Sequence, residues 1–302
     1  MRTGRSRLYR RRIPPRLNLI SRVKQLPTIA AMKAACRQIT RSGKTLGFVP
    51  TMGALHEGHL ALVRAAKARC NVTAVSIFVN PLQFGPTEDL AEYPRPLERD
   101  TALLEALGVD LLFLPSVEEM YPAGAQTRVM VTGISDKLDG ASRPGHFHGV
   151  TTVVSKLFEI VRPDLAFFGQ KDAAQVAVLR KMVSDLDMDV DLIVCPIVRE
   201  KDGLAMSSRN VYLSPEQRQQ ALVLYRSLLR VQSAVDRGER DAAKLREIGE
   251  QVIAEEPEVR LDYFAIVDPE TLDPVANTTR GALVAVAAYV GATRLIDNIV
   301  LT

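Results

Sequence analysis

The sequence predicts an α/β protein, with a doubly wound parallel sheet followed by a smaller α+β C-terminal domain. Two observations support this fold class. Apolar, often β-branched runs alternate with helical stretches over residues 45–198, which is the pattern of consecutive βαβ units. After about residue 200 the pattern changes to two helices and three strand-like runs. The chain has 302 residues, 47% of them hydrophobic and 25% charged, so it is long and apolar enough for a substantial core.

The first part of the predicted fold alternates five strands with four helices. The run 72–79 is β-branched and therefore strand-like, whereas Leu60, Val63 and Ala66 recur at helical spacing. In chain order we expect a strand at 45–51, a helix at 60–68, a strand at 72–79, a helix at 97–107, a strand at 110–114, a helix at 150–161, a strand at 165–168, a helix at 173–185 and a strand at 190–198.

The second part begins with a clear helix start. Ser214 is a favourable N-cap and Pro215 suits the first helical position, so a helix is expected from there to about Asp236, with Gly238 as the stop. A second helix is expected at 242–254, and strands at 261–267, 283–289 and 294–301. The predicted domains are therefore 22–198 and 199–302, preceded by an arm at 1–21.

The positive charge is concentrated in that arm. The formal net charge is +4, but the first 24 residues hold nine Arg and Lys residues and no acid, which leaves −5 for the rest. The arm lacks an apolar segment and is not a secretory signal. We interpret it as a disordered solvated tail or as sequence translated from an early start codon. An organelle transit peptide and a nucleic-acid-binding arm are the alternatives, and no nucleic-acid partner is expected.

The cysteines and the absence of long apolar runs indicate the cellular compartment in which the protein is expected. Cys36, Cys70 and Cys195 are odd in number, widely spaced and set among apolar neighbours, so we expect small buried thiols in a reducing compartment. No run of 18 apolar residues is present, so no membrane association is expected. We therefore predict a cytoplasmic protein.

The first candidate site is a strand-to-helix turn that carries two histidines. The segment Pro50-Thr51-Met52-Gly53-Ala54-Leu55-His56-Glu57-Gly58-His59 ends a strand and opens a helix. Helix N-termini bind anions, and the glycines allow a polyphosphate to approach the backbone. His56 and His59 share one helix face, where they would neutralise charge on a phosphate. The alternatives are that both histidines cap the helix, or that they bind zinc together with His146 and His148.

Three further groups of polar residues are expected at the same edge of the sheet. Met206-Ser207-Ser208-Arg209-Asn210 combines hydroxyls with a guanidinium, which suits phosphate if it folds over the first motif. Gly169-Gln170-Lys171-Asp172 follows a strand and supplies a cation, although Asp172 as a plain N-cap is the alternative. Asn80 and Gln83 follow another strand and suit hydroxyl or carboxylate groups.

Six motifs in order make the chain closely resemble the pantothenate synthetase family, the pantoate–β-alanine ligases, from about residue 22 onward. The motifs are P-T-M-G-A-L-H-E-G-H (50–59), S-I-F-V-N-P-L-Q-F (76–84), E-Y-P-R (92–95), S-R-P-G-H-F (142–147), F-G-Q-K-D (168–172) and D-G-L-A-M-S-S-R-N (202–210). The first resembles the HIGH signature of nucleotidylyltransferases, and M-S-S-R-N resembles their KMSKS signature.

The resemblance implies a Rossmann-like N-terminal domain and a homodimer that makes pantothenate in two steps. Pantoate would attack the α-phosphate of Mg-ATP to give pantoyl adenylate and pyrophosphate, and β-alanine would then displace AMP. The implied catalytic residues are His56, His59, Lys171, Ser207, Ser208 and Arg209. The implied ATP site comprises residues 50–59, Gly169, Gln170, Lys171, Asp172, Val198, Met206, Ser207, Ser208 and Arg209. Gln83, Gln175, Asn80, Arg143 and His146 would bind the substrates, and Asp100 is a candidate Mg²⁺ ligand.

The chain departs from the family pattern at several positions. Gln170 replaces the usual Glu beside Lys171, Ala173 and Ala174 replace an aromatic residue and a Gln, and His148 replaces an Arg. Three other functions stay open at this point. They are another adenylate-forming or nucleotidyl-transferring enzyme on the same fold, a nucleic-acid-binding module that uses the arm, and a zinc hydrolase.

Overall fold

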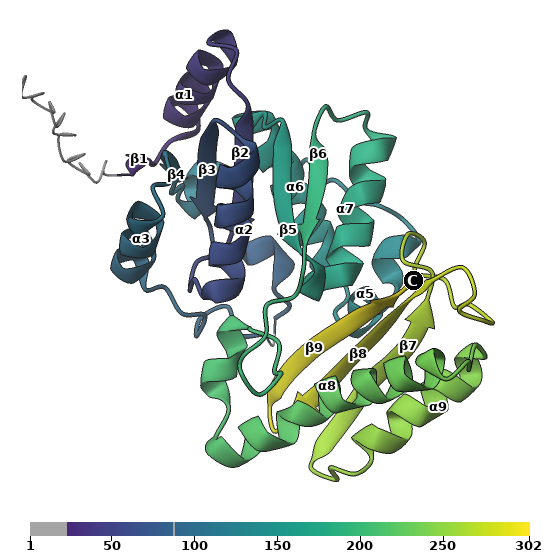
Figure 1. Cartoon of the computed structure of the whole chain (residues 1–302). Helices are drawn as coiled ribbons and strands as arrows, with labels where there is room; N and C mark the ends of the chain where they lie inside the picture. Colours follow the sequence, from purple (N-terminus) through teal and green to yellow (C-terminus); the bar gives the residue numbers. More distant parts are fainter. Residues whose placement is uncertain (1–22, 87) are drawn as a thin grey trace, which may run out of the picture.

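The computed structural model describes residues 23–86 and 88–302, and it contains two sheets (Figure 1). The first sheet has six parallel strands in the order β1-β4-β3-β2-β5-β6. Their bounds are β1 Lys24–Leu26, β2 Leu46–Thr51, β3 Val72–Ile77, β4 Leu111–Phe113, β5 Leu165–Gly169 and β6 Asp191–Cys195. The predicted doubly wound parallel sheet is therefore confirmed.

Alternating side chains of these strands enter two different cores. Phe48 packs with α1 (Ile29–Arg41), α6 (His146–Val161) and α7 (Ala173–Asp185), whereas the adjacent Val49 packs with α2 (Glu57–Arg69) and α3 (Leu97–Ala106). The same alternation separates Phe168 from Phe167. Because both faces are covered by helices, the strands are apolar at almost every position. Short helices complete this part: α4 Val117–Met120, α5 Asp139–Ser142, and the 3₁₀ turns η1 Pro81–Gln83, η2 Ile134–Asp136 and η3 Gln170–Asp172.

The strand order creates a crevice beside β2. From β2 the chain moves outward through β3 and β4, and β5 then returns to the opposite side of β2. Ligands of doubly wound sheets bind at the carboxyl ends of the strands, at this reversal. The loops after β2, β3 and β5 carry three of the motifs singled out in the sequence, so the topology brings those motifs to one edge.

The second sheet is antiparallel, in the order β7-β8-β9, with bounds Val259–Val267, Ala282–Val290 and Thr293–Leu301. Figure 1 shows α8 (Pro215–Asp236) and α9 (Ala242–Ile253) along one face of it. Val284 and Val286 face these helices, whereas Leu283 and Ala285 belong to the core that underlies the first sheet. The two sheets therefore share one apolar core. The turn η4 (Ser208–Tyr212) lies between β6 and α8 in the chain.

Most predicted elements are present. Helix α7 matches to the residue, and α8 begins with the predicted Ser214 cap in a capping box and ends at Asp236. Helix α6 begins a turn earlier than predicted, at His146, and the last strand of the first sheet ends at Cys195 because Pro196 follows. Strand β1 and helix α1 were not predicted.

The proposed arm, 1–21, lies outside the described residues, and the domain boundary near residue 198 stays a prediction. Among residues 23–86 and 88–302, no helix is long and apolar enough to span a bilayer.

Candidate functional site

The turn after β2 has an unusual backbone that neighbouring side chains hold in place. Gly53 and Ala54 both have positive φ angles, of 87° and 51°, and both are buried. A side chain at Gly53 would meet Ile77 at 3.0 Å, so only glycine fits there. Asp100 of α3 holds the turn, since its Oδ1 accepts a hydrogen bond from the Leu55 N–H at 2.9 Å. Strained backbone of this kind, held by its surroundings, is typical of ligand sites.

The histidine pair caps α2. The Gly58 N–H donates to Nδ1 of His56 at 3.2 Å, and the His56 N–H donates to Nδ1 of His59 at 3.4 Å. The capping alternative is thus present in the structure. It does not exclude phosphate binding, because acceptor Nδ1 atoms place the proton of each neutral ring on Nε2, which remains a donor. The rings lie 4.1 Å apart between centroids. Gly58 makes room for the His56 ring, which a methyl group there would approach to 2.9 Å.

Both histidines are neutral at pH 7 in the free protein. Burial, reinforced by the charge of Lys171, lowers the pKa of His56 to about 4. Burial, reinforced by His56, lowers the pKa of His59 to about 3. The nearby Asp172 carboxylate opposes both effects. A bound phosphate would add negative charge beside the rings and so raise both pKa values.

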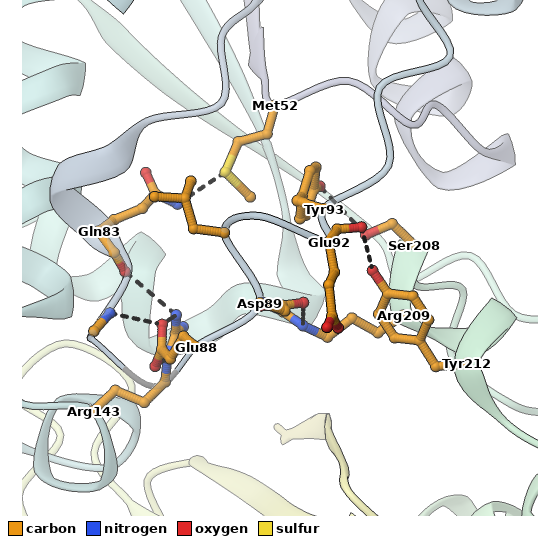
Figure 2. A network of polar contacts seen from close by, with 12 residues as sticks. Met52, Gln83, Glu88, Asp89, Glu92, Tyr93, Arg143, Ser208, Arg209 and Tyr212 are labelled. Carbon is orange, nitrogen blue, oxygen red and sulfur yellow. Dashed lines mark hydrogen bonds and ion pairs between the residues drawn. The ribbon is translucent and has the colours of Figure 1, made fainter.

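Gln83 is oriented by a buried network after β3. Asn80 donates to Oε1 of Gln83 and to the carbonyl of Gly149, both at 3.0 Å, and its own Oδ1 accepts from the Tyr121 hydroxyl at 2.9 Å. Nε2 of Gln83 lies 3.2 Å from the Met52 sulfur, which joins this loop to the turn after β2 (Figure 2). Asn80 is 1% exposed and is used entirely inside the protein. Asn80 therefore holds Gln83 in place. The prediction that Asn80 itself faces the cavity is wrong, because its side chain is buried.

A cleft of about 830 Å³ lies between the loops and helices beside the first sheet and strand β9 of the second. Its size suits a nucleotide with a second small molecule. The predicted residues that line it are Arg143, His146, Lys171, Asp172, Gln175, Ser207 and Arg209. His56, His59, Gln83 and Met206 are not in this wall. The candidate residues therefore divide between the open cleft and the more enclosed turn after β2, and their roles stay predictions.

Two adjacent carboxylates hold the two arginines expected to bind phosphate. Glu88 accepts from Nε and Nη2 of Arg143, both at 2.7 Å. Asp89 accepts from Nε of Arg209 at 3.1 Å and from its Nη2 at 2.9 Å. Figure 2 shows both pairs. Each guanidinium thus already makes a bidentate contact through Nε and Nη2, the kind of contact that it could also make with a phosphate.

Arg143 is also held from its other side. Nδ1 of His146 donates to the carbonyl of Gln83 at 2.8 Å, and its Nε2 accepts from Arg143 at 3.0 Å. This requires a neutral ring, and burial together with the Arg143 charge lowers the pKa of His146 to about 4. His148, two residues further along α6, does not line the cleft.

The M-S-S-R-N segment folds over the first motif, as the phosphate hypothesis required. A methyl group on Gly58 would lie 3.9 Å from Cβ of Met206, so the two segments are adjacent. Ser207 caps η4 by accepting from the Arg209 N–H at 3.2 Å. The Ser208 hydroxyl lies 3.4 Å from that of Tyr93 (Figure 2). The N–H of Met206 donates to the carbonyl of Val198, which places Val198 beneath this segment.

The turn after β5 presents a cation to the cleft. Lys171 donates to Oδ1 of Asp172 at 3.2 Å. Asp172 occupies the N-cap position of α7 but makes no cap hydrogen bond, so the plain N-cap alternative does not describe it. A Cβ added to Gly169 would meet nothing within 4 Å, so space is open beside that backbone. Ala173 and Ala174 are buried in the core, and only Gln175 of these three faces the cleft.

The zinc alternative is wrong for the described residues. They contain no group of three or more His, Cys, Asp or Glu side chains placed to hold a metal. His146 has both ring nitrogens engaged, and the Nδ1 atoms of His56 and His59 are used in capping. Asp100 is 1% exposed and holds the turn after β2. These residues therefore do not form a protein cage for Mg²⁺, and a Mg²⁺ role for Asp100 stays a prediction.

The thiols are not placed for catalysis. Cys36 and Cys195 are buried as predicted, whereas Cys70 is half-buried at the end of α2. Burial raises the pKa of all three thiols, that of Cys36 to about 12. They are therefore protonated at neutral pH and poor nucleophiles.

Sequence reasoning missed several residues of the site. Glu88 and Asp89 follow the Asn80–Phe84 motif closely, but only the fold shows that they face the arginines. Tyr121 comes from a distant loop and carries no local signal. The cleft is also lined by Arg294 of β9, whose guanidinium is held by Asp139 and Asp262 at 2.7 and 2.8 Å.

Comparisons with known proteins match this chain over most of its length. A family model described as pantoate-beta-alanine ligase matches residues 24–300. The pantothenate synthetase of Koribacter versatilis is 65% identical over 274 residues, which cover 91% of this chain and 94% of that protein. A crystal structure of pantothenate synthetase from Thermus thermophilus has a TM-score of 0.88 at 51% identity and covers 92% of this chain and 99% of that one. A pantoate-beta-alanine ligase from Francisella tularensis, complexed with beta-gamma ATP and beta-alanine, has a TM-score of 0.74 at 34% identity, with 92% and 97% covered.

Proposed function

This chain belongs to the pantoate-beta-alanine ligase family, and from that premise we propose that it condenses pantoate with β-alanine at the expense of ATP. In the first step the pantoate carboxylate attacks the α-phosphate, a P–O bond breaks, and pyrophosphate leaves. In the second step the amine of β-alanine attacks the acyl carbon of pantoyl adenylate, AMP leaves with the C–O electron pair, and the nitrogen gives up a proton to solvent. The products are pantothenate, AMP and pyrophosphate. No covalent enzyme intermediate is needed, which agrees with the absence of an activated thiol among the described cysteines.

Three cations and two neutral hydrogen-bond donors would bind the negatively charged phosphates. Lys171, Arg143 and Arg209 line the cleft from three separate segments. The Nε2–H groups of His56 and His59 point from the start of α2, where the helix dipole also favours an anion. As charge develops on the α-phosphate, donors fixed in advance stabilise it without reorganisation. His59 is the candidate for the largest contribution, with His56 beside it.

Pantoate is held by amides. Gln83 has its Oε1 occupied by Asn80, so its Nε2–H is the group left to bind the carboxylate or a hydroxyl, after exchanging the weak contact with Met52. Gln175 lines the cleft on the other side, from α7. Neutral donors fit a substrate that carries one carboxylate and two hydroxyls, whereas a phosphorylated substrate would need more cations there.

Several finer features belong to the proposal. Mg²⁺ would be bound mainly by the ATP phosphates and water, because the described residues contain no cluster of three or more metal-ligating side chains, with Asp100 as the one candidate protein ligand. A homodimer and a cytoplasmic location follow from the family resemblance and are proposed with it.

The observation that carries the proposal is the meeting of the two signature motifs, at Gly58 and Met206, beside the cleft that Lys171, Arg143 and Arg209 line. The test is AMP release by the purified protein with ATP and pantoate, with and without β-alanine. Steady AMP and pantothenate formation is expected only when both substrates are present. If no pantothenate forms under those conditions, the proposal is wrong.

A further inference from the structure

Arg199 and Asp297 form a largely buried ion pair between the chain that follows β6 and strand β9. Nη1 and Nη2 of Arg199 donate to the two carboxylate oxygens of Asp297, at 2.6 and 2.9 Å. The side chain of Arg199 is 18% exposed and that of Asp297 is 3% exposed. The guanidinium also lies over the Tyr225 ring of α8, 3.8 Å from its centroid. A bidentate contact combined with stacking fixes the plane of the guanidinium, which a lysine ammonium could not reproduce.

The residues that follow Arg199 form a hairpin that leads directly into the M-S-S-R-N segment. Arg199 and Ala205 pair as an antiparallel bridge, and the Met206 N–H donates to the Val198 carbonyl at 3.0 Å. Nη1 of Arg199 also donates to the carbonyl of Gly203, in the turn of the hairpin, at 3.1 Å. The Arg199 side chain therefore joins the turn of this hairpin to β9.

The M-S-S-R-N segment is also bonded back to the same hairpin. Nδ2 of Asn210, the last residue of the segment, donates to Oε1 of Glu200 at 3.0 Å and to the carbonyl of Ala205 at 3.1 Å. The segment carries Ser207 and Arg209, which line the cleft. Because both ends of the segment are attached to the hairpin, the position of the hairpin determines where these two side chains lie.

The residue next to Asp297 holds the other cationic segment of the cleft. Nδ2 of Asn298 donates to the carbonyl of Lys171 at 2.9 Å, and the Asn298 N–H donates to Oδ1 of Asp297 at 2.7 Å. Side chains of adjacent strand residues point to opposite faces, so the two residues reach different segments. Consecutive residues of β9 thus hold the hairpin that carries Arg209 and the turn that carries Lys171.

We propose that Arg199 and Asp297 are positioning residues that hold Ser207 and Arg209 at a fixed distance from Lys171, so that the two segments together bind the phosphates of ATP. This rests on the proposed function, because it takes ATP as the ligand of the cleft. Neither member of the pair has to contact the nucleotide. If the pair is broken, the hairpin is no longer tied to β9 and the M-S-S-R-N segment moves relative to Lys171.

The test compares the wild type, Arg199→Lys, Asp297→Asn and the double variant. Arg199→Lys keeps the charge but loses the bidentate contact, and Asp297→Asn keeps the shape but loses one acceptor oxygen. Single-turnover release of pyrophosphate from ATP and pantoate should slow about 10- to 100-fold in each single variant, because small misplacements of fixed groups are costly. The double variant should lose about as much as the worse single variant, since the pair acts as a unit. Losses that multiply would overturn the proposal.

Measuring the two half-reactions separately distinguishes positioning from a general loss of structure. The second step starts from pantoyl adenylate, from which the β- and γ-phosphates have already left. With supplied pantoyl adenylate and β-alanine, its rate should therefore fall by about threefold at most. Equal slowing of both steps would overturn the proposal. Arg226→Lys is the matched control, because Arg226 pairs with Glu255 and Glu256 at the surface and should leave both steps unchanged.

A binding measurement keeps the inference distinct from the proposed function. Calorimetric titration with Mg-ATP alone should show about tenfold weaker binding by both single variants. A purely electrostatic role predicts the opposite for Asp297→Asn, because that change removes a negative charge from the cleft wall, and tighter binding would overturn the proposal. If the wild type makes no pantothenate yet both variants bind ATP more weakly, the activity is wrong and the positioning role stands. If the variants and the wild type do not differ, the positioning role is wrong whatever the enzyme makes.

Discussion

The ion pair between Glu88 and Arg143 should stabilise the free protein and oppose ATP binding, and Glu88→Gln separates these two effects. Burial alone would raise the pKa of Glu88, but the hydrogen bonds and charge of Arg143 outweigh it and lower the pKa to about 2. Relative to the ordinary value of 4.5, this corresponds to up to about 3 kcal/mol of stabilisation. The Glu88 side chain is 23% exposed, so screening by water is limited.

The sign of the pH dependence follows from the direction of that shift. Because the pKa of Glu88 is lowered in the folded protein, its contribution is fully present above pH 4.5 and is lost as the pH falls toward 2. Glu88→Gln should therefore lower the free energy of unfolding by up to about 3 kcal/mol at pH 7, and by progressively less below pH 4.5. Urea titrations of both proteins at a series of pH values measure this difference.

The same substitution should strengthen ATP binding. Arg143 no longer has to leave a carboxylate for a phosphate, and recovering half of the pair's energy would tighten the dissociation constant about tenfold. Isothermal titration calorimetry measures it. Glu92→Gln is the matched control, because Glu92 lines the same cleft, is exposed, and makes no ion pair with a described residue. If the two variants behave alike in both stability and ATP binding, the reasoning is refuted.

Three further predictions concern the enclosed part of the site. His59→Ala should slow pantoyl adenylate formation by about 100- to 1,000-fold, since one fixed donor to the transition state is lost. Single-turnover release of pyrophosphate measures this rate. An unchanged rate would remove His59 from that role. NMR titration of the free protein should give His56 and His59 pKa values of about 4 and about 3, because burial favours the neutral rings. Both pKa values should rise when ATP is bound. Ordinary values near 6.5 in the free protein would contradict the described environment. Tyr121→Phe should raise KM for pantoate about fivefold with little change in kcat, because Asn80 loses a hydrogen-bond partner and holds Gln83 less firmly. Steady-state kinetics measure both constants. A change confined to kcat would argue against a positioning role.

The fold was largely predictable because its local signals agree with its tertiary structure. Helix α8 follows a Ser-Pro start, and the strands of the first sheet are apolar since both faces are covered. The failures have physical reasons. Strand β1 has only three residues, too few for a periodic pattern. Helix α6 begins at His146 because Gly145, at a φ of 82°, turns the chain into it, and that angle is not visible in the sequence.

The sequence suggested the candidate site residues, whose roles stay predictions, but it did not reveal the side chains that hold them. The turn after β2 and the M-S-S-R-N segment have chemistry that suits phosphate, and topology alone brings such loops to one edge. Ion pairs such as Arg209 with Asp89 join positions 120 residues apart, so no local pattern reveals them. The capping by His56 and His59 was only one of several alternatives, and the structure shows that it uses Nδ1 and leaves Nε2 of each ring as a donor.

The shared apolar core restricts how the cleft can open. Leu283 and Ala285 of the second sheet are buried in the same core as Phe48 of the first. Pulling the sheets apart would expose this surface to water, which is costly, whereas rocking one sheet over the other keeps it covered. A rotation about this core would therefore open the cleft at a lower cost than a separation of the two sheets. The same continuity couples the two halves during denaturation, so calorimetry of the intact chain should record one cooperative heat-absorption peak instead of two.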